Sequence, residues 1–216
     1  MQFEDILSFF FPEYCIGCGK QGSALCAICE RTVTTKPIAL SGNTAALFDY
    51  QNPLVKKAVW ALKYHRKRAL AKYFGTALYR EFFKSLAHKN IQQRGDIVLL
   101  PIPGGKKAIA IRGYNHATLI AKTIHDCGKV DGLSLTVEGN QLYKHREVPQ
   151  QVRAREKSKR EKNVRGIFAI RNPKALEGKT VILIDDVITT GATTNEARRV
   201  VKACNPKRVL CIAVAH

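Results

Sequence analysis

Apolar positions along the chain follow two spacings, which predict amphipathic helices and short buried strands. Over residues 53–65, and again over 68–86, apolar side chains recur every three to four positions, and both stretches are therefore expected to be helical. Residues 96–103 and 180–184 contain consecutive apolar residues instead. Such short runs are typical of strands buried on both faces of a parallel sheet.

The same alternation continues through the rest of the chain. We expect extended segments at about 45–50, 167–170 and 208–214, and helices at about 114–125 and 194–204. Residues 141–165 are polar and basic without apolar periodicity, so a long mobile loop is expected there. Strands alternating with helices predict an α/β fold with a mainly parallel twisted sheet and flanking helices.

The composition changes near residue 41, which suggests two parts. Residues 1–40 are expected to form an N-terminal helix and a cysteine knuckle, and residues 41–216 the main domain. No apolar run approaches the roughly 18 residues of a membrane span. The first residues carry neither a basic flank nor a small-residue cleavage site, so no secretory signal peptide is expected.

Charge is the most unusual bulk property. The 216 residues include 36 Lys and Arg against 17 Asp and Glu, a formal net charge of +19. A field of this sign attracts polyanions such as nucleic acid, nucleotides or anionic membranes. A generally basic proteome would give the same composition, so charge favours a polyanionic partner without identifying one.

Four of the seven cysteines follow the spacing C-x2-C-x7-C-x2-C: Cys15, Cys18, Cys26 and Cys29. Four thiolates from two such turns complete a closed tetrahedral zinc site, which has no open position for chemistry. An iron–sulfur cluster is the alternative, and the knuckle is either a structural clamp or a nucleic-acid reader. An odd number of cysteines without a secretion signal favours a reducing compartment.

The most informative stretch joins the strand over residues 180–184 to the helix that follows it. Asp185 and Asp186 stand at the end of the strand, where ligands bind in open α/β sheets. These carboxylates can accept hydrogen bonds from ribose hydroxyls and position Mg²⁺ through water. Backbone N–H groups and hydroxyls at the helix start suit a phosphate group, and we assign this role to Thr189, Thr190, Gly191, Ala192 and Thr193.

A second candidate loop follows the strand at 96–103. Its two glycines permit a tight bend, and its cations can balance a diphosphate; the residues are Pro103, Gly104, Gly105, Lys106 and Lys107. Arg112, a few residues later, is the better candidate for a planar bidentate contact with phosphate.

The double-aspartate stretch resembles the ribose-phosphate-binding motif of type I phosphoribosyltransferases, and the whole chain resembles the ComF family. Besides the four-cysteine knuckle, the similarity rests on Leu62-Lys63-Tyr64-His65, on Arg112-Gly113-Tyr114-Asn115 and on residues 149–150 and 160–168. His116 and Ile188 depart from the usual family residues. The resemblance implies a cytoplasmic protein of DNA uptake in natural transformation, handling single strands, with inner-membrane uptake machinery as a further partner. It also implies phosphoribosyl pyrophosphate with Mg²⁺ as the ligand.

Two basic segments are candidates for nucleic-acid contact. Between Lys144 and Arg165 there are nine Lys or Arg and three Glu; this loop could close over a bound diphosphate, grip a nucleic-acid backbone, or be solvated. A second set lies near Tyr64 and Tyr73, where charge and stacking together could hold a single strand, although a solvated helix face has the same composition. The nucleic-acid candidates are Lys63, Arg66, Lys67, Arg68, Arg153, Arg155, Lys157, Lys159 and Arg160.

Three functions are compatible with these features. The leading hypothesis is an uptake factor that binds phosphoribosyl pyrophosphate and single-stranded DNA. The alternative is an active phosphoribosyltransferase, with Asp185 and Asp186 as the catalytic pair, but the sequence marks no pocket for an acceptor base. The third is a regulator that senses phosphoribosyl pyrophosphate.

Overall fold

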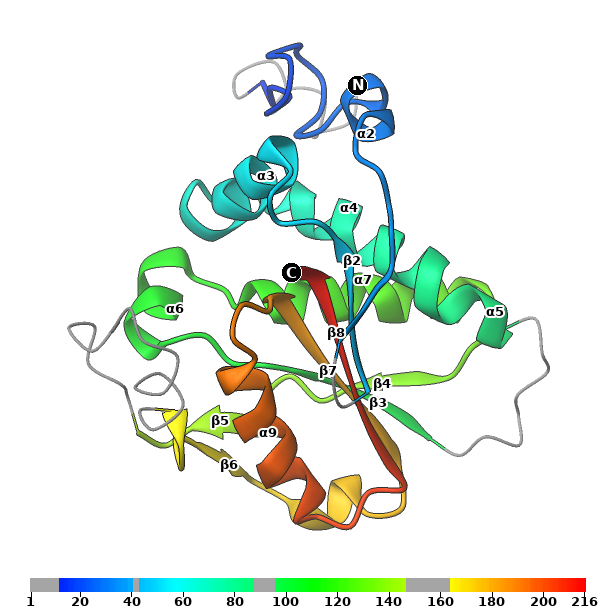
Figure 1. Ribbon diagram of the computed structural model, residues 1–216, viewed down its shortest axis with the longest axis vertical. Coiled ribbons are helices and arrows are strands. Elements are labelled where there is room, and N and C mark those ends of the chain that lie inside the picture. The colour runs from blue at the N-terminus through cyan, green and yellow to red at the C-terminus, as the bar shows by residue number, and fades with distance from the viewer. Residues whose placement is uncertain (1–11, 41–42, 88–95, 147–163) are drawn as a thin grey trace, which may run out of the picture.

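A six-stranded sheet forms the centre of the protein (Figure 1). The computed structural model describes residues 12–40, 43–87, 96–146 and 164–216. The strand order is β1-β2-β8-β7-β3-β4, and every neighbouring pair is parallel except β1 and β2. The bounds are β1 (Ile38–Leu40), β2 (Thr44–Phe48), β3 (Ile97–Pro101), β4 (Leu135–Val137), β7 (Thr180–Val187) and β8 (Arg208–Ala215). This confirms the predicted α/β fold with a mainly parallel sheet.

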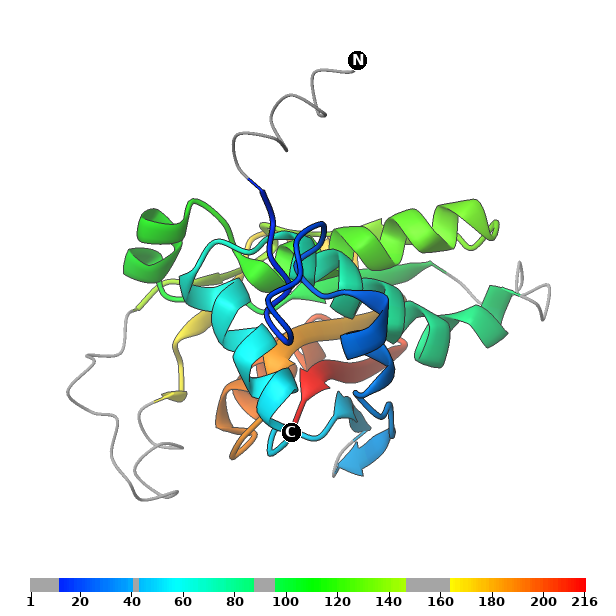
Figure 2. The same cartoon turned by 90° about the horizontal axis from the view of Figure 1, so that it is seen from above.

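Helices cover both faces of the sheet (Figures 1 and 2). One face packs against α3 (Pro53–Tyr64), α4 (Ala69–Leu78) with its π-helical extension η1 (Tyr79–Phe83), and α7 (His116–Val130); the short α5 (Lys84–Ala87) continues η1. The other face packs against α9 (Ala192–Lys202). A 3₁₀ turn, η4 (Pro173–Leu176), precedes β7.

The alternation of side chains along β7 divides its residues between these two cores. Ile182 and Ile184 belong to the cluster shared with α3, α4 and α7. Val181 and Leu183 belong to the cluster shared with α9. Because successive strand residues point to opposite faces, Asp186 continues the first series and Asp185 the second.

Two segments that were expected to be loops contain regular structure. α6 (Lys106–Arg112) lies between β3 and the helix that was expected from about residue 114, and it includes Lys106 and Lys107 of the expected diphosphate loop; Gly113 ends this helix with a φ of 80°. None of its residues is buried, which explains why no apolar periodicity marks it in the sequence.

The expectation of a continuous loop over residues 141–165 was also wrong at its start. β5 (Leu142–Lys144) pairs with β6 (Phe168–Ile170) in a separate antiparallel sheet. Leu142 and Phe168 are both buried in the core shared with α9, and three residues are too few to show a period. Residues 147–163 lie outside the described part.

The cysteine-containing segment packs onto the main domain. It includes α2 (Ala27–Arg31), and its Ala24 and Val33 are buried in the same cluster as α3 and α4. β1 follows it and pairs with β2, with Leu40 opposite Thr44. Residues 1–11, where an N-terminal helix was expected, are outside the described part. Among the described helices, none is sufficiently long and apolar to cross a bilayer.

Gly75 of α4 lies against α7 and gives a test of this helix contact. A Cβ at this position would lie 2.5 Å from Thr123 Cβ and 2.9 Å from the Ile120 carbonyl oxygen. Although alanine favours helix formation, we expect Gly75→Ala to lower the free energy of unfolding by about 1–3 kcal/mol, because the helices must separate. Chemical denaturation measures this change.

Gly104→Ala is the matched control, since a Cβ there would meet its nearest neighbour, a side-chain atom of Ile109, at 3.6 Å. Equal stability of the two variants would contradict the close α4–α7 contact.

Candidate functional site

The carboxyl end of β7 leads through a short turn into α9. Asp185 and Asp186 lie within the last three residues of the strand, and α9 begins at Ala192. Gly191 precedes the helix with a φ of 75°, a conformation that costs an L-residue roughly 1–2 kcal/mol. The Ala192 N–H donates to Thr190 Oγ1 at 3.4 Å. The structure thus brings the assigned phosphate residues, Thr189 to Thr193, together at the amino end of a helix.

Asp186 is enclosed by basic side chains from two different helices. Its side chain contacts residues of both α3 and α7, and the residue is only 4% exposed. Lys63 Nζ of α3 lies 2.9 Å from Asp186 Oδ1, and His116 Nε2 of α7 contacts Asp186 Oδ2. One carboxylate therefore ties the sheet to both helices that cover this face.

The proton affinities of the two acids differ accordingly. Burial raises the pKa of Asp185 to about 7, and the charge of Asp186 adds to this effect. Burial also opposes ionisation of Asp186, but His116 and Lys63 hold the pKa of that carboxyl well below its ordinary value. Asp186 therefore carries its charge at neutral pH, whereas Asp185 lies near its titration midpoint and responds to a nearby cation or hydrogen-bond donor.

Arg112 contacts His116 through the ring nitrogen that does not face Asp186. Its Nη1 lies 3.0 Å from His116 Nδ1, and its guanidinium lies 5.3 Å from the centroid of the Tyr64 ring. Because arginine can only donate, His116 Nδ1 is the acceptor, and Nε2 carries the proton that faces Asp186. His116 thus joins Arg112 to Asp186.

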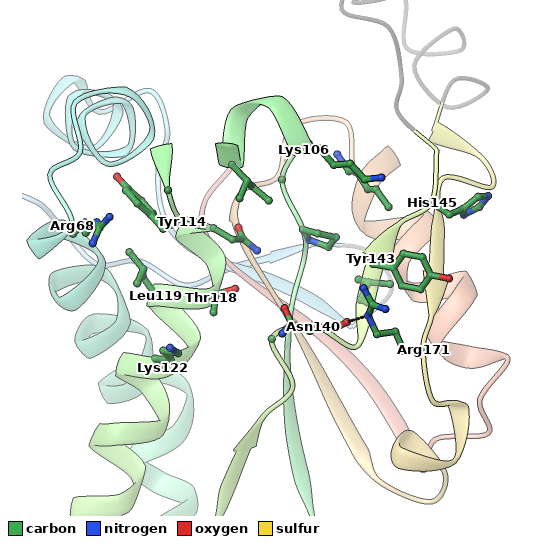
Figure 3. Close-up of a pocket in the computed structure, with 18 residues that line it drawn as sticks. Arg68, Lys106, Tyr114, Thr118, Leu119, Lys122, Asn140, Tyr143, His145 and Arg171 are labelled. Atoms are coloured by element: carbon green, nitrogen blue, oxygen red, sulfur yellow. Dashed lines mark hydrogen bonds between the residues drawn. The ribbon is translucent and has the colours of Figure 1, made fainter. Parts of the chain in front are cut away.

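The expected diphosphate residues are divided between two places. Pro103, Gly104 and Lys106 line a cavity of about 820 Å³ (Figure 3). Gly105 precedes α6, Lys107 lies in its first turn and Arg112 ends it. The cavity is lined by none of these last three residues, and by neither acid nor any of Thr189–Thr193. The cavity nevertheless adjoins the end of β7, because its Lys144 interacts electrostatically with Asp185, and the Ile102 N–H, just before Pro103, donates to the Ile184 carbonyl oxygen at 2.9 Å.

The basic set near α3 is also dispersed. Lys63 is engaged with Asp186, and Arg66 Nη2 donates to the Ile111 carbonyl oxygen at 3.0 Å. Arg68 lines the cavity, with its guanidinium 4.7 Å from the centroid of the Tyr114 ring. The Lys67 side chain is partly buried. The other nucleic-acid candidates, Arg153, Arg155, Lys157, Lys159 and Arg160, lie outside the described residues.

Sequence reasoning did not single out three residues of the cavity: Lys122, Tyr143 and Arg171. They lie on α7, on β5 and directly after β6. Lys122 is one turn beyond Thr118 on a helix that was expected from the sequence, but no local pattern connects it to Arg171. Only the fold brings these residues to one cavity.

The four knuckle cysteines form a compact sulfur cluster that is consistent with a bound metal such as zinc. Their Sγ atoms all lie within 4.8 Å of one another. Cys18 Sγ and Cys26 Sγ are 3.6 Å apart, close to the roughly 3.8 Å edge of a tetrahedron with Zn–S bonds of about 2.3 Å. A Cβ on Gly17 would lie 2.6 Å from Cys29 Sγ, so glycine is needed beside the cluster.

The electrostatics of the cluster also favour a cation. Although burial opposes ionisation, backbone N–H groups of Cys18 and Cys26 lower the pKa of the Cys15 thiol to about 6. Burial and the neighbouring cysteines raise the pKa of Cys29 to about 12. Cys15 and Cys29 can therefore both ionise near neutral pH only when a cation compensates their charge.

Comparison with known proteins agrees with this architecture. The Phosphoribosyl transferase domain family matches residues 109–216, half of the chain. Competence protein ComFC of Bacillus subtilis (strain 168) is 29% identical over 193 residues, which cover 86% of this chain and 70% of that protein.

Two solved structures are similar at lower identity. HGPRT-ase from Leishmania tarentolae in complex with GMP is 12% identical with a TM-score of 0.37, over 68% of this chain and 65% of that chain. The allosteric regulatory enzyme of purine biosynthesis is 19% identical with a TM-score of 0.35, over 66% of this chain and 25% of that chain. The present chain thus spans less than two thirds of either enzyme.

The ion pair between Lys63 and Asp186 can be tested by its effect on stability. Lys63→Met leaves a buried carboxylate with one polar partner fewer, and we expect a loss of about 2 kcal/mol in the free energy of unfolding. Lys56→Met, at an exposed position of the same helix, is the control. In a double-mutant cycle with Asp186→Asn, we expect a coupling energy of at least about 1 kcal/mol. Strictly additive effects would show that the two side chains do not interact.

Proposed function

Since the chain belongs to the Phosphoribosyl transferase domain family, we propose that it binds phosphoribosyl pyrophosphate with Mg²⁺ at the carboxyl end of β7. The observation that carries this proposal is the continuous path from an acidic strand end through Gly191 into the amino end of α9. Backbone N–H groups and the helix dipole at that end favour a dianionic 5′-phosphate. The acids that precede the turn are suited to ribose hydroxyls and to a hydrated Mg²⁺.

The two acids have different roles in this proposal. Asp185 is partly exposed, so it accepts hydrogen bonds from the ribose hydroxyls and faces the metal. Asp186 is the positioning residue: its contacts with Lys63 and His116 fix the end of β7 against α3 and α7. Arg112 and Lys107 are the cations proposed to contact the diphosphate; they lie in the last and first turns of α6.

We assign the protein to DNA uptake in the cytoplasm, peripheral to inner-membrane uptake machinery. Support comes from the 29% identity to a protein named for competence and from the net charge of +19. The contact with single-stranded DNA is sequence-independent and weakens with salt, because it depends on release of counterions from phosphates.

A second candidate function is transfer of ribose 5-phosphate to a nucleobase with release of pyrophosphate. It is favoured by the family match, which includes both acids and the turn before α9. Positioning and electrostatic stabilisation would carry this reaction, with Asp185 near the cationic ribose. Pyrophosphate release across a panel of bases distinguishes it from ligand binding alone.

The ligand site can be tested by calorimetric titration with phosphoribosyl pyrophosphate and Mg²⁺. We expect Asp185→Asn to weaken binding at least tenfold, because the variant cannot present a carboxylate to the ribose or the metal. Asp126→Asn, which removes an exposed acid on α7, is the matched control and should bind as the wild type does. Undiminished affinity of Asp185→Asn would remove this site assignment.

We propose that the metal of the knuckle is zinc and that it is structural, because four cysteines leave no coordination position open. Elemental analysis of the purified protein should find about one zinc per chain, and Cys18→Ser should lose the metal and lower thermal stability. Cys127→Ser, which changes a cysteine outside the cluster, should retain it. Stoichiometric iron in place of zinc would contradict the assignment.

A further inference from the structure

We propose that an exposed patch, formed by the end of α3 and the end of α6, docks an acidic segment of a partner protein. The α3–α6 patch consists of Trp60, Tyr64, His65, Arg66 and Ile111. The inference goes beyond the proposed function and does not depend on it, because it concerns neither the acid pair nor the turn before α9. Its support comes from exposure, from contacts within the patch and from charge.

Large apolar side chains are concentrated on this patch. Six such side chains are exposed among the described residues, and three of them belong to the patch: Trp60 (54% exposed), Tyr64 (54%) and Ile111 (74%). The other three lie on the knuckle and at the end of α7. α6 buries none of its residues and lies at the margin of the fold in both views (Figures 1 and 2). Exposed apolar side chains that cluster in this way mark contact sites, whereas single ones do not.

Contacts within the chain hold the patch in one arrangement. The centroid of the Trp60 ring lies 5.2 Å from that of Tyr64 and 5.1 Å from that of His65. Arg66 Nη2 donates to the Ile111 carbonyl oxygen at 3.0 Å, which joins the end of α3 to α6. Side chains that are already ordered lose little conformational freedom on binding, and Trp, Tyr and Arg are the residue types that dominate binding energy at protein interfaces. The patch is therefore suited to a protein partner.

The charge around the patch determines which partner fits. α3 and α6 together contain six Lys or Arg and no Asp or Glu. Since arginine binds a carboxylate through two parallel hydrogen bonds, an acid of the partner can pair with Arg66 while apolar side chains of the partner cover Trp60 and Ile111. A second copy of this chain fits poorly, because each copy has a net charge of +19 and would place cations against cations.

The same contacts disfavour a nucleic-acid strand and a lipid surface. The Tyr64 ring has Trp60 against it at an interplanar angle of 53° and the Arg112 guanidinium over it, so it is not an open platform for a stacked base. Insertion of Trp60 into a bilayer would carry Arg66 with it. The contact of Arg66 with the Ile111 carbonyl oxygen would have to break before the guanidinium could reach the headgroups.

A selection on the full chain from a phage-displayed library tests this inference, with random peptides of about 12 residues that contain no tryptophan. Because Trp60 is the single tryptophan of the chain, its fluorescence reports on the patch alone. We expect the enriched peptides to combine Asp or Glu with apolar residues. Titration of the synthetic peptide should shift the emission of Trp60 to shorter wavelength, because the exposed indole is removed from water.

Two glutamate variants establish where the peptide binds. Ile111→Glu should weaken binding at least about tenfold, because a repelling charge replaces an apolar contact. Val130→Glu is the matched control, since it makes the same charge change at an apolar side chain that is 86% exposed at the end of α7, and it should change affinity less than about threefold. The control is needed because so basic a chain attracts acidic peptides everywhere. Circular dichroism and metal content establish that each variant is folded.

Arg66→Gly separates binding from structure. Arg66 has a φ of 54°, a left-handed backbone conformation that glycine adopts at lower cost. We therefore expect the variant to be at least as stable as the wild type in thermal unfolding, but to bind the peptide at least about threefold more weakly. A purely structural role of this arginine predicts the opposite pair of results, lower stability with unchanged binding.

Peptides that leave the Trp60 emission unchanged, or that bind Ile111→Glu as tightly as Val130→Glu, would overturn the inference, and so would a selection that enriches no acidic peptide. Oligothymidine and vesicles that contain phosphatidylglycerol are titrated in parallel. If Ile111→Glu loses as much affinity for either of them as for the peptide, the patch is a nucleic-acid or lipid surface instead. A dimer that Ile111→Glu abolishes would assign the patch to a second copy. Failure of the proposed phosphoribosyl site would change none of these outcomes.

Discussion

The buried carboxylate of Asp186 is the interaction on which the site depends. It lies at the end of the central strand β7 and contacts Lys63 of α3 and His116 of α7. Since an isolated charge at this depth would be strongly unfavourable, the two helices must stay in place for the strand end to remain ionised. Arg112 extends the contact to the end of α6. A single acid thus links four elements, and it leaves its neighbour Asp185 on the opposite side of the strand.

This division gives two adjacent aspartates different chemistry. The pleat of β7 sends Asp186 toward the core shared by α3, α4 and α7, and Asp185 toward the side of α9. His116 and Lys63 lower the pKa of Asp186, while burial and the neighbouring negative charge raise the pKa of Asp185 to about 7. Asp186 fixes the strand end against the helices. Asp185 can respond to a bound ligand, and it lies near the amino end of α9, which suits the phosphate group of that ligand.

Features encoded in contiguous residues could be predicted from the sequence. The path from β7 to α9 and the four-cysteine cluster depend on spacing within a short segment, and the structure brings their residues together. Lys63, in contrast, was grouped with its basic neighbours, because nothing local shows that α3 crosses the end of β7. The large cavity was not predicted for the same reason: Arg68, Lys122 and Arg171, which line it, come from distant parts of the chain. The helix α6 was not predicted because none of its residues is buried, so its sequence lacks an apolar period.

A crystal structure of the protein with phosphoribosyl pyrophosphate and Mg²⁺ tests the central claim most directly. The 5′-phosphate should lie at the amino end of α9 against residues 190–193, with the ribose hydroxyls or the metal shell at Asp185 and the contact between Lys63 and Asp186 retained. A ligand whose phosphates lie instead between Arg68 and Arg171, with neither Asp185 nor the amino end of α9 in contact with it, would contradict the account.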